Sequence, residues 1–490
     1  MQQPIITVNN LSYSYPSEQE DVLKDISFAV NEGEIFGIVG PSGCGKSTLM
    51  LALSGLIPHS IKGTLRGTVA LAGKETTVLS MAELSQTVQL LFQSPDAQLF
   101  ALNVEDEIHF GLENLNLPWK EIEERTSSAL KTVGIIDLRQ RSLEELSSGQ
   151  KQRVALASVL AMAPKILLFD EPTANLDPPA VKSLLQTIQQ LRKKHTVIII
   201  EHNVDFIASI CDRVLLMHEG KSLKCDTPKK VMASAEYQKS MAPVCNHAQI
   251  LERLKKIPSL CKNETLLKVE ELSFTYPNKI HVLSNLSLEI GKGDFLGILG
   301  MNGSGKSTLA LNLIGLLKGK GRIVLAGKDI SNQDAFQRTR NIGYVFQNPN
   351  YQLFEENLDA EIAFGPRNLG LKQEEVQHRV EEALRVTHLA KFRTHDPHAL
   401  SVGQKRRVSI ASILAMQPEI IIVDEPDTGL DHKTARSFMD YIRKLNKEGR
   451  TIILISHNLE LLAEYCTRII ALKNGKVVNP VEIYKEYVVV

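Results

Sequence analysis

Short, continuous apolar runs recur along the chain, and they form two sets with the same order. One run in each set, residues 34–39 and residues 294–299, ends at a glycine-rich turn. Continuous apolar runs of this length predict strands that are buried on both faces, as in parallel sheets. The stretches at about 103–145 and 357–398 are rich in Glu and Leu and predict helices. The pattern therefore predicts an α/β fold that is built twice.

The two sets form a tandem repeat with a nearly fixed offset. Lys46 and Lys306 lie 260 positions apart, whereas Gln93 and Gln347, further along each copy, lie 254 positions apart. The second copy is therefore six residues shorter between these points. A chain of 490 residues exceeds the ~250–300 at which a single core stops growing. We predict a first domain at 1–245, a linker at 246–265 with a helical stretch at 248–256, and a second domain at 266–490.

The glycine-rich turn of each half leads from an apolar strand into a helical run. Both turns fit the pattern of a phosphate-binding loop, in which backbone N–H groups and the start of a helix surround phosphate oxygens. The lysine is expected to reach the β and γ phosphates, and the serine after it to bind Mg²⁺. The predicted nucleotide ligands are Gly40, Ser42, Gly43, Gly45, Lys46, Ser47 and Thr48 in the first half, and Gly300, Asn302, Gly303, Gly305, Lys306, Ser307 and Thr308 in the second.

Two adjacent acids end another apolar run in each half. They are Asp170 and Glu171 in the first half, and Asp424 and Glu425 in the second. Open α/β sheets bind ligands at the carboxyl ends of their strands. The first acid of each pair suits the coordination shell of Mg²⁺, and the second can orient or polarise a water beside the γ phosphate.

A glutamine and a histidine end further apolar runs in each half. Gln93 and Gln347 precede a loop that contains proline, and their amides can contact a metal ion or a water. His202 and His457 can donate a hydrogen bond to the γ phosphate. Taken alone, a surface glutamine and a structural histidine are the commoner outcomes. The repetition in both halves favours the functional interpretation.

Two more repeated features have a structural and a functional interpretation. Tyr15 and Tyr276 lie 25 and 24 residues before the first glycine of the turn, where each could stack on an adenine ring or simply pack. A serine and a glycine at the start of an apolar helix could face a phosphate, or the serine could be an ordinary helix cap. The residues at these helix starts are Ser147, Gly149 and Gln150, and Ser401, Gly403 and Gln404.

Composition narrows the class of protein. Lys and Arg total 56, and Asp and Glu also total 56, so there is no overall positive field for nucleic acid. No uncharged apolar run approaches the ~18 residues of a membrane helix, and the start of the chain does not resemble a signal peptide. The six cysteines form no CxxC pair, which suits a reducing cytosol.

Taken together, these motifs resemble those of ABC ATPases, and the resemblance covers essentially both halves. It implies two tandem P-loop NTPase (ABC-type) nucleotide-binding domains, each with a helical subdomain, that use ATP and Mg²⁺. It implies D-loop aspartates at Asp177 and Asp431. By the same resemblance the catalytic residues are Glu171, His202, Glu425, His457, Gln93 and Gln347, and the metal ligands are Ser47, Gln93, Asp170, Ser307, Gln347 and Asp424.

The resemblance also implies how the halves cooperate. In ABC ATPases each ATP lies between the phosphate loop of one domain and the signature segment of the other. Lys46 would then work with Ser401, and Lys306 with Ser147, within one chain. The signatures read LSSGQ and LSVGQ where LSGGQ is commonest. Because Val402 replaces a small residue, the site that it completes is expected to be slower.

A narrower resemblance lies just after Gln93 and Gln347. The segments FQSPDAQLF and FQNPNYQLF, followed by EIHFG and EIAFGP, look like the energy-coupling factor group of importers. That resemblance implies an ATP-hydrolysing subunit that energises import of a vitamin, its precursor or a transition-metal ion. Its partners would be an integral membrane scaffold (T-component) and a substrate-binding membrane protein (S-component), and it would lie peripherally on the cytoplasmic face of the cell membrane. An acid is common after the proline; Asp96 fits and Asn350 does not.

Two other hypotheses remain open from the sequence. A soluble twin-ABC protein that acts on ribosomes or nucleic acid would also lack membrane helices, although such proteins usually have a longer charged helical linker. A twin-ABC sugar importer tends to have one degenerate half, whereas both halves here keep the catalytic residue types.

Overall fold

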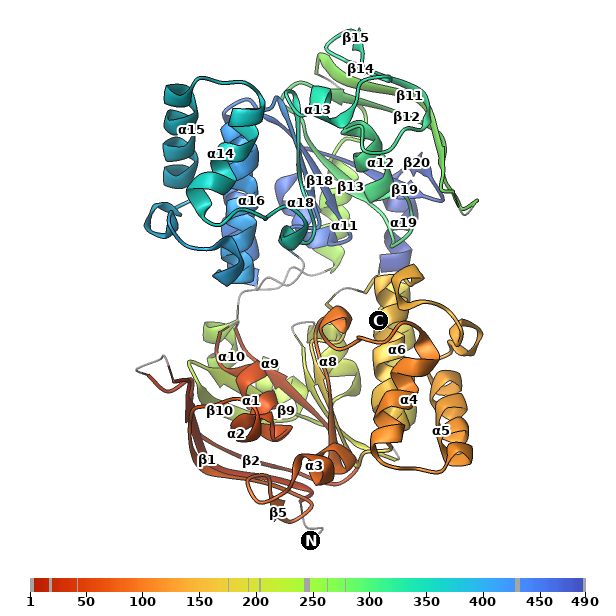
Figure 1. Cartoon of the computed structure of the whole chain (residues 1–490), viewed down its shortest axis with the longest axis vertical. Coiled ribbons are helices and arrows are strands. Elements are labelled where there is room, and N and C mark those ends of the chain that lie inside the picture. Colours follow the sequence, from red (N-terminus) through yellow and green to blue (C-terminus); the bar gives the residue numbers. More distant parts are fainter. Residues whose placement is uncertain are drawn as a thin grey trace. The chain divides into compact units, whose positions relative to one another are not determined.

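The computed structural model describes residues 4–487, except 17–19, 42, 175, 193, 202–203, 242–246, 262, 278 and 428–431. The described residues fall into two compact units that divide near residue 243. Each unit has the same kinds of layers, namely an antiparallel sheet, a mainly parallel sheet, and helices (Figure 1).

The first unit contains two sheets. Its strands are β1 (Ile6–Ser14), β2 (Leu23–Val30), β3 (Ile35–Val39), β4 (Thr64–Leu71), β5 (Lys74–Glu75), β6 (Val88–Leu91), β7 (Ile166–Asp170), β8 (Thr196–Ile200), β9 (Arg213–His218) and β10 (Lys221–Asp226). One sheet has the order β2-β1-β4-β5 and is antiparallel. The other has the order β10-β9-β3-β8-β7-β6 and is parallel except at β10.

Helices cover the six-stranded sheet and form a separate helical part of the first unit. They are α1 (Lys46–Leu53), α2 (Leu56–His59), α3 (Met81–Thr87), α4 (Val104–Asn114), α5 (Trp119–Thr132), α6 (Ser148–Ala161), α7 (Pro178–Leu191), α8 (Val204–Ile210), α9 (Pro228–Met232) and α10 (Ala235–Ser240). Helices α4 and α5 pack on α6, which confirms the helical stretch predicted at 103–145. Alternate residues of β3 enter different cores, Ile35 on one face of the sheet and Phe36 on the other, so both faces are buried.

The second unit repeats this plan. Its strands are β11 (Thr265–Thr275), β12 (His281–Gly291), β13 (Phe295–Leu299), β14 (Lys320–Leu325), β15 (Lys328–Asp329), β16 (Ile342–Val345), β17 (Ile420–Asp424), β18 (Thr451–Ser456), β19 (Arg468–Lys473) and β20 (Lys476–Val478). The sheet orders are β12-β11-β14-β15 and β16-β17-β18-β13-β19-β20. Its helices are α11 (His247–Lys256), α12 (Lys306–Leu313), α13 (Ala335–Arg338), α14 (Leu358–Asn368), α15 (Gln373–Val386), α16 (Val402–Met416), α17 (His432–Lys447), α18 (Leu459–Tyr465) and α19 (Pro480–Tyr487).

The stretch predicted as a linker, 246–265, includes α11, and its described residues belong to the second unit. Ile250 and Leu254 are buried in the same core as β13 and α18, because they lie one helical turn apart on one face of α11. Ser259 accepts a hydrogen bond from Arg468 Nε at 2.8 Å through its carbonyl oxygen. In the part of the chain that the structure describes, no helix is long and apolar enough to cross a membrane.

Candidate functional site

The glycine-rich turn of each unit wraps around its own lysine. Lys46 Nζ donates to the carbonyl oxygens of Gly40 and Pro41 at 2.8 and 3.0 Å. Lys306 makes the corresponding two contacts in the second unit, at 2.7 and 3.1 Å. Both lysines are buried. The turn therefore holds one positive charge at the start of a helix in each unit, as a phosphate site requires.

At two positions of the first turn, Gly40 and Gly45, the backbone requires glycine rather than another amino acid. Gly45 is the N-cap of α1 and has a φ of 98°, which only glycine adopts readily. A Cβ on Gly40 would lie 2.3 Å from the carbonyl oxygen of Met217. The first glycine thus permits close packing against β9, and the later one lets the chain turn into the helix.

A cavity of about 680 Å³ lies over this turn in the first unit. Its lining includes Tyr15, Lys46, Ser47, Thr48 and Glu171, which were all predicted from the sequence. The Tyr15 hydroxyl lies 3.2 Å from the hydroxyl of Thr48, and Tyr276 and Thr308 make the same contact in the second unit. The structure thus places each tyrosine beside its phosphate-binding turn.

The carboxylate of Asp424 has the surroundings of a metal ligand. It ends β17, shares a hydrogen bond with Ser307, and accepts one from the Tyr344 hydroxyl at 2.7 Å through Oδ2. Its other oxygen is buried and has no hydrogen-bond partner among the described residues. Burial, with the neighbouring Glu425, raises the pKa of Asp424. A divalent cation would satisfy that oxygen and favour the ionised carboxylate, so the residues present fit Mg²⁺.

Both glutamates that were predicted to be catalytic have an unusual backbone conformation. Glu171 has a φ of 47° and Glu425 a φ of 45°, in the left-handed region. The N–H of each donates to the neighbouring strand, to Ile200 at 3.0 Å and to Ile455 at 2.9 Å. Strained conformations of residues other than glycine concentrate at functional sites. Glu219 and Glu271 have similar φ values, so the conformation alone does not mark a catalytic acid, but its recurrence at the same place in both units was not indicated by the sequence.

The two glutamates have different side-chain neighbours. Glu171 Oε2 accepts a hydrogen bond from Gln93 Nε2 at 2.8 Å. Glu425 Oε2 lies 2.6 Å from His457 Nδ1, and Lys306 Nζ lies 3.7 Å from Glu425 Oε1. Burial would raise the pKa of Glu425, but the charges of His457 and Lys306 hold that pKa below its ordinary value. Burial would lower the pKa of His457, and Glu425 holds that pKa above its ordinary value instead.

The contact between His457 and Glu425 leads to a prediction about stability and pH. Because the pKa of Glu425 is lowered, its stabilising contribution is complete above pH 4.5 and is lost on acidification. Because the pKa of His457 is raised, its contribution is complete below pH 6.5 and is lost as the pH rises through the raised value. We expect His457→Ala to destabilise the second unit by about 1–3 kcal/mol near pH 5.5 and by less near pH 9. Thermal unfolding at the two pH values measures this, with His398→Ala, an exposed histidine, as the control. An equal loss of stability at both values would contradict the ion pair.

The loop after each predicted glutamine is held against the helix that carries the serine and glycine motif. Asp96, in the 3₁₀ turn Pro95–Ala97, pairs with Lys151 Nζ at 2.6 Å. Asn350, in the turn Pro349–Tyr351, accepts from Lys405 Nζ at 3.3 Å. The second half therefore keeps the contact with a neutral acceptor where the first half has an acid.

The serines at the starts of α6 and α16 are helix caps. Ser147 Oγ accepts from the Gln150 N–H at 3.3 Å, and Ser401 Oγ accepts from the Gln404 N–H at 3.4 Å. Each glutamine side chain accepts a hydrogen bond from the serine N–H at 2.9 Å in return. Each serine thus caps a helix in its own unit, as the structural interpretation predicted. That these serines, with Gly149 and Gly403, contact a phosphate remains a prediction.

Some of the remaining predicted residues have visible contacts, and others lie outside the described residues. Asp177 caps α7, because its Oδ1 accepts from the Ala180 N–H at 3.1 Å. Gln347 follows β16, and its carbonyl oxygen accepts from Arg406 Nη2 at 3.2 Å. Sequence reasoning missed Tyr344 and Arg406, which contact Asp424 and the carbonyl oxygen of Glu425 from buried positions. The predictions for Ser42, His202 and Asp431 lie outside the described residues.

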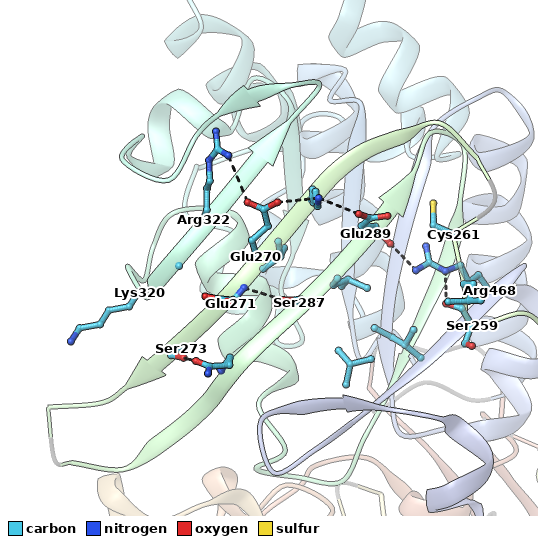
Figure 2. Close-up of a pocket in the computed structure, with 18 residues that line it drawn as sticks. Ser259, Cys261, Glu270, Glu271, Ser273, Ser287, Glu289, Lys320, Arg322 and Arg468 are labelled. Carbon is cyan, nitrogen blue, oxygen red and sulfur yellow. Dashed lines mark hydrogen bonds and ion pairs between the residues drawn. The ribbon is translucent and has the colours of Figure 1, made fainter.

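Two other polar features lie away from this site. A cavity of about 1030 Å³ lies on the antiparallel sheet of the second unit, where Lys268 pairs with Glu270 and Glu289. Figure 2 labels both glutamates among the residues that line it. None of the predicted site residues lines it. In the first unit, Glu105 and Glu123 lie beside His109, but Arg139 donates to both carboxylates. The Arg139 guanidinium thus already neutralises these two carboxylates. We therefore take the glycine-rich turns, and neither of these two features, as the candidate functional site.

Glycine-rich turns that hold a buried lysine at the start of a helix, beside strands that end at two adjacent acids, define an ATP-binding protein of the P-loop class. Comparison with known proteins narrows the class. The family model described as ABC transporter matches residues 23–174 and 283–428. The chain belongs to the ABC transporter family and has two of its ATP-binding domains in tandem, so the predicted fold class is confirmed.

Proteins with similar sequences, aligned over nearly the whole chain, support this assignment. A protein of Methanosarcina mazei is 38% identical, with 96% of this chain and 88% of its own length aligned. One of Bacillus thuringiensis is also 38% identical, with 97% and 90% aligned. Both carry the name "Putative ABC transporter ATP-binding protein". The solved structure of cbiO1 from Clostridium perfringens, described as part of the ABC transporter complex cbiONQ, is 38% identical and covers 46% of this chain and 92% of its own, with a TM-score of 0.42.

Proposed function

We propose that the chain is the ATP-hydrolysing subunit of an importer of the energy-coupling factor type. Its cargo would be a vitamin, a vitamin precursor or a transition-metal ion. The observation that carries the proposal is the pair of loop segments after Gln93 and Gln347, the Q-loops of the two halves. Each segment ends in an exposed phenylalanine that meets a second exposed phenylalanine on the following helix.

The exposed aromatic residues have the same arrangement in both units. Phe100 and Phe110 are 64% and 50% exposed, and their rings meet edge to face at 4.7 Å. Phe354 and Phe364, the corresponding pair, are 58% and 41% exposed and also lie 4.7 Å apart. Exposed apolar groups that gather in one place mark surfaces for a partner. Apolar helices of a membrane scaffold are the partner that this surface would fit.

Buried acids fix the backbone that presents these rings. Glu107 Oε2 accepts from the N–H groups of Phe100 and Ala101 at 3.0 and 2.9 Å. Glu361 Oε2 accepts from Phe354 and from the residue after it, both at 2.9 Å. A buried carboxylate is retained only with such partners. The end of each segment is thereby tied to α4 or α14, so that a force on the aromatic residues would reach the helical part of the unit.

The proposed reaction is hydrolysis of ATP. Lys46 and Lys306 would contact the phosphates, and Glu171 and Glu425 would each orient a water for attack on the γ phosphorus. Mg²⁺ would be held by Ser47, Gln93 and Asp170 in one site, and by Ser307, Gln347 and Asp424 in the other, where it would neutralise phosphate charge. Most of the acceleration would come from positioning and charge stabilisation.

The two halves are proposed to complete each other's sites. Lys46 would share one ATP with Ser401 and Gly403, and Lys306 would share the other with Ser147 and Gly149. Covalent fusion keeps the second half at a high effective concentration, so intramolecular pairing would be favoured. The chain would lie peripherally on the cytoplasmic face of the membrane, bound to a scaffold T-component and a substrate-binding S-component.

Co-purification tests this function. We expect the tagged chain to retain a small integral membrane protein from detergent-solubilised membranes of its own organism. Phe354→Ser should lower that recovery by about 10-fold or more, because aromatic residues dominate the energy of interfaces. Val78→Ser, an exposed apolar residue that follows β5, is the control and should change nothing. Recovery of ribosomes or RNA in place of a membrane protein would overturn the proposal.

A further inference from the structure

A buried arginine joins the two loops that carry the reacting groups of the second unit. Arg406 lies near the start of α16 and is 4% exposed. Its Nη1 donates to the carbonyl oxygen of Glu425 at 2.9 Å, and its Nη2 donates to the carbonyl oxygen of Gln347 at 3.2 Å. One side chain therefore connects the helix of the LSVGQ motif with the end of β17 and with the loop after β16.

The chemistry of arginine makes this connection stiff. The guanidinium group is planar, and its N–H donors have fixed directions relative to one another. Two carbonyl oxygens that bind separate nitrogens of one guanidinium cannot move apart without losing a hydrogen bond. A buried charge left without its partners is costly, so the three elements are expected to move together.

In the first unit, other side chains join the two loops that correspond to these. The counterpart of Arg406, 254 positions earlier, is Gln152, which is 3% exposed and donates from Nε2 to the carbonyl oxygen of Pro172 at 2.6 Å. There the Q-loop meets the catalytic acid through side chains, since Gln93 donates directly to Glu171. The contact through a backbone-binding arginine thus distinguishes the second unit from the first.

We propose that Arg406 is a positioning residue that keeps the Q-loop of the second unit in register with the catalytic Glu425. A displacement of that loop by a bound partner would pass through this side chain to Glu425. The loop is also linked to α16 by Lys405, which donates to Asn350, so the specific role of Arg406 is the link to Glu425. The inference rests on the proposed ATP hydrolysis for its catalytic consequence, but the mechanical link itself does not depend on that function.

Hydrogen exchange of the full-length chain tests the link directly. Arg406→Gln introduces the residue of the first unit and removes the fork, so amides of 348–354 should exchange about fivefold faster, as expected for the loss of one hydrogen bond. Amides of 408–416 in α16 should be unchanged. The kcat for ATP should fall about threefold to 10-fold while KM stays within about twofold, because positioning and not binding is lost. Arg407→Gln removes the same charge at the adjacent position and should leave exchange at 348–354 unchanged.

A second substitution separates geometry from charge. Arg406→Lys keeps the positive charge, but a single ammonium group lacks the planar fork, so it should not restore slow exchange or the full kcat. Full rescue by lysine, unchanged exchange at 348–354 in Arg406→Gln, or an equal acceleration throughout α16 would each overturn the proposal. A wild-type chain without ATP turnover would contradict the proposed function alone, since the exchange result would still decide the role of Arg406.

Discussion

We expect Glu425→Gln to lower the rate of ATP hydrolysis by about 100-fold or more, and Glu171→Gln to have the same effect. Glutamine keeps the shape of the side chain but has no negative charge with which to polarise a water. In the second unit the wild-type carboxylate is kept ionised by His457 and Lys306, which lower its pKa, so the substitution removes a charge that the site is built to hold.

Steady-state phosphate release measures this effect, and nucleotide binding provides the necessary second measurement. Affinity for ATP should change little, because neither glutamate is predicted to contact the phosphates directly. Glu448→Gln, which neutralises an exposed acid after α17, is the matched control and should retain full turnover. If Glu425→Gln kept normal turnover while Glu171→Gln did not, the second site would not be catalytic, and hydrolysis would take place at the first site alone.

The features that could be predicted from the sequence are those fixed by local pattern. The buried strands and the glycine-rich turns need only apolar runs and glycines at set spacings, so the positions of Lys46 and Lys306 inside the turns could be predicted from the sequence, whereas their contact with phosphate stays a prediction. The repeat strengthened each assignment, because a coincidence in one half would not recur in the other. The helix at 248–256 could also be predicted, but its burial on the second unit depends on tertiary packing that its own residues do not specify.

Other features depend on neighbours that are distant in the sequence. The left-handed conformation of Glu171 and Glu425 is imposed by their hydrogen bonds to the adjacent strand, and glutamate itself disfavours it. Arg406 looks in sequence like one more basic residue beside Lys405 and Arg407, and its burial appears only when α16 packs against two loops. A serine such as Ser147 could not be assigned from sequence to a cap or to a phosphate, because the same hydroxyl serves both.

Lys46→Ala and Lys306→Ala should each weaken ATP binding at one site by about 10-fold to 100-fold, the range expected for loss of a hydrogen bond to a charged group. Titration calorimetry at moderate ATP concentration should then show one high-affinity site per chain in each single variant and none in the double variant.

The two lysine substitutions should differ in one respect. Lys306 lies 3.7 Å from Glu425 and helps to lower the pKa of that acid, so Lys306→Ala should also bring the pKa of Glu425 closer to its ordinary value. Lys74→Ala, at an exposed position of β5, is the control for loss of a lysine and should bind two ATP molecules as the wild type does. Two sites of unchanged affinity in Lys306→Ala would show that the second turn does not bind phosphate, and a loss of both sites in either single variant would show that each lysine supports binding in the other half as well.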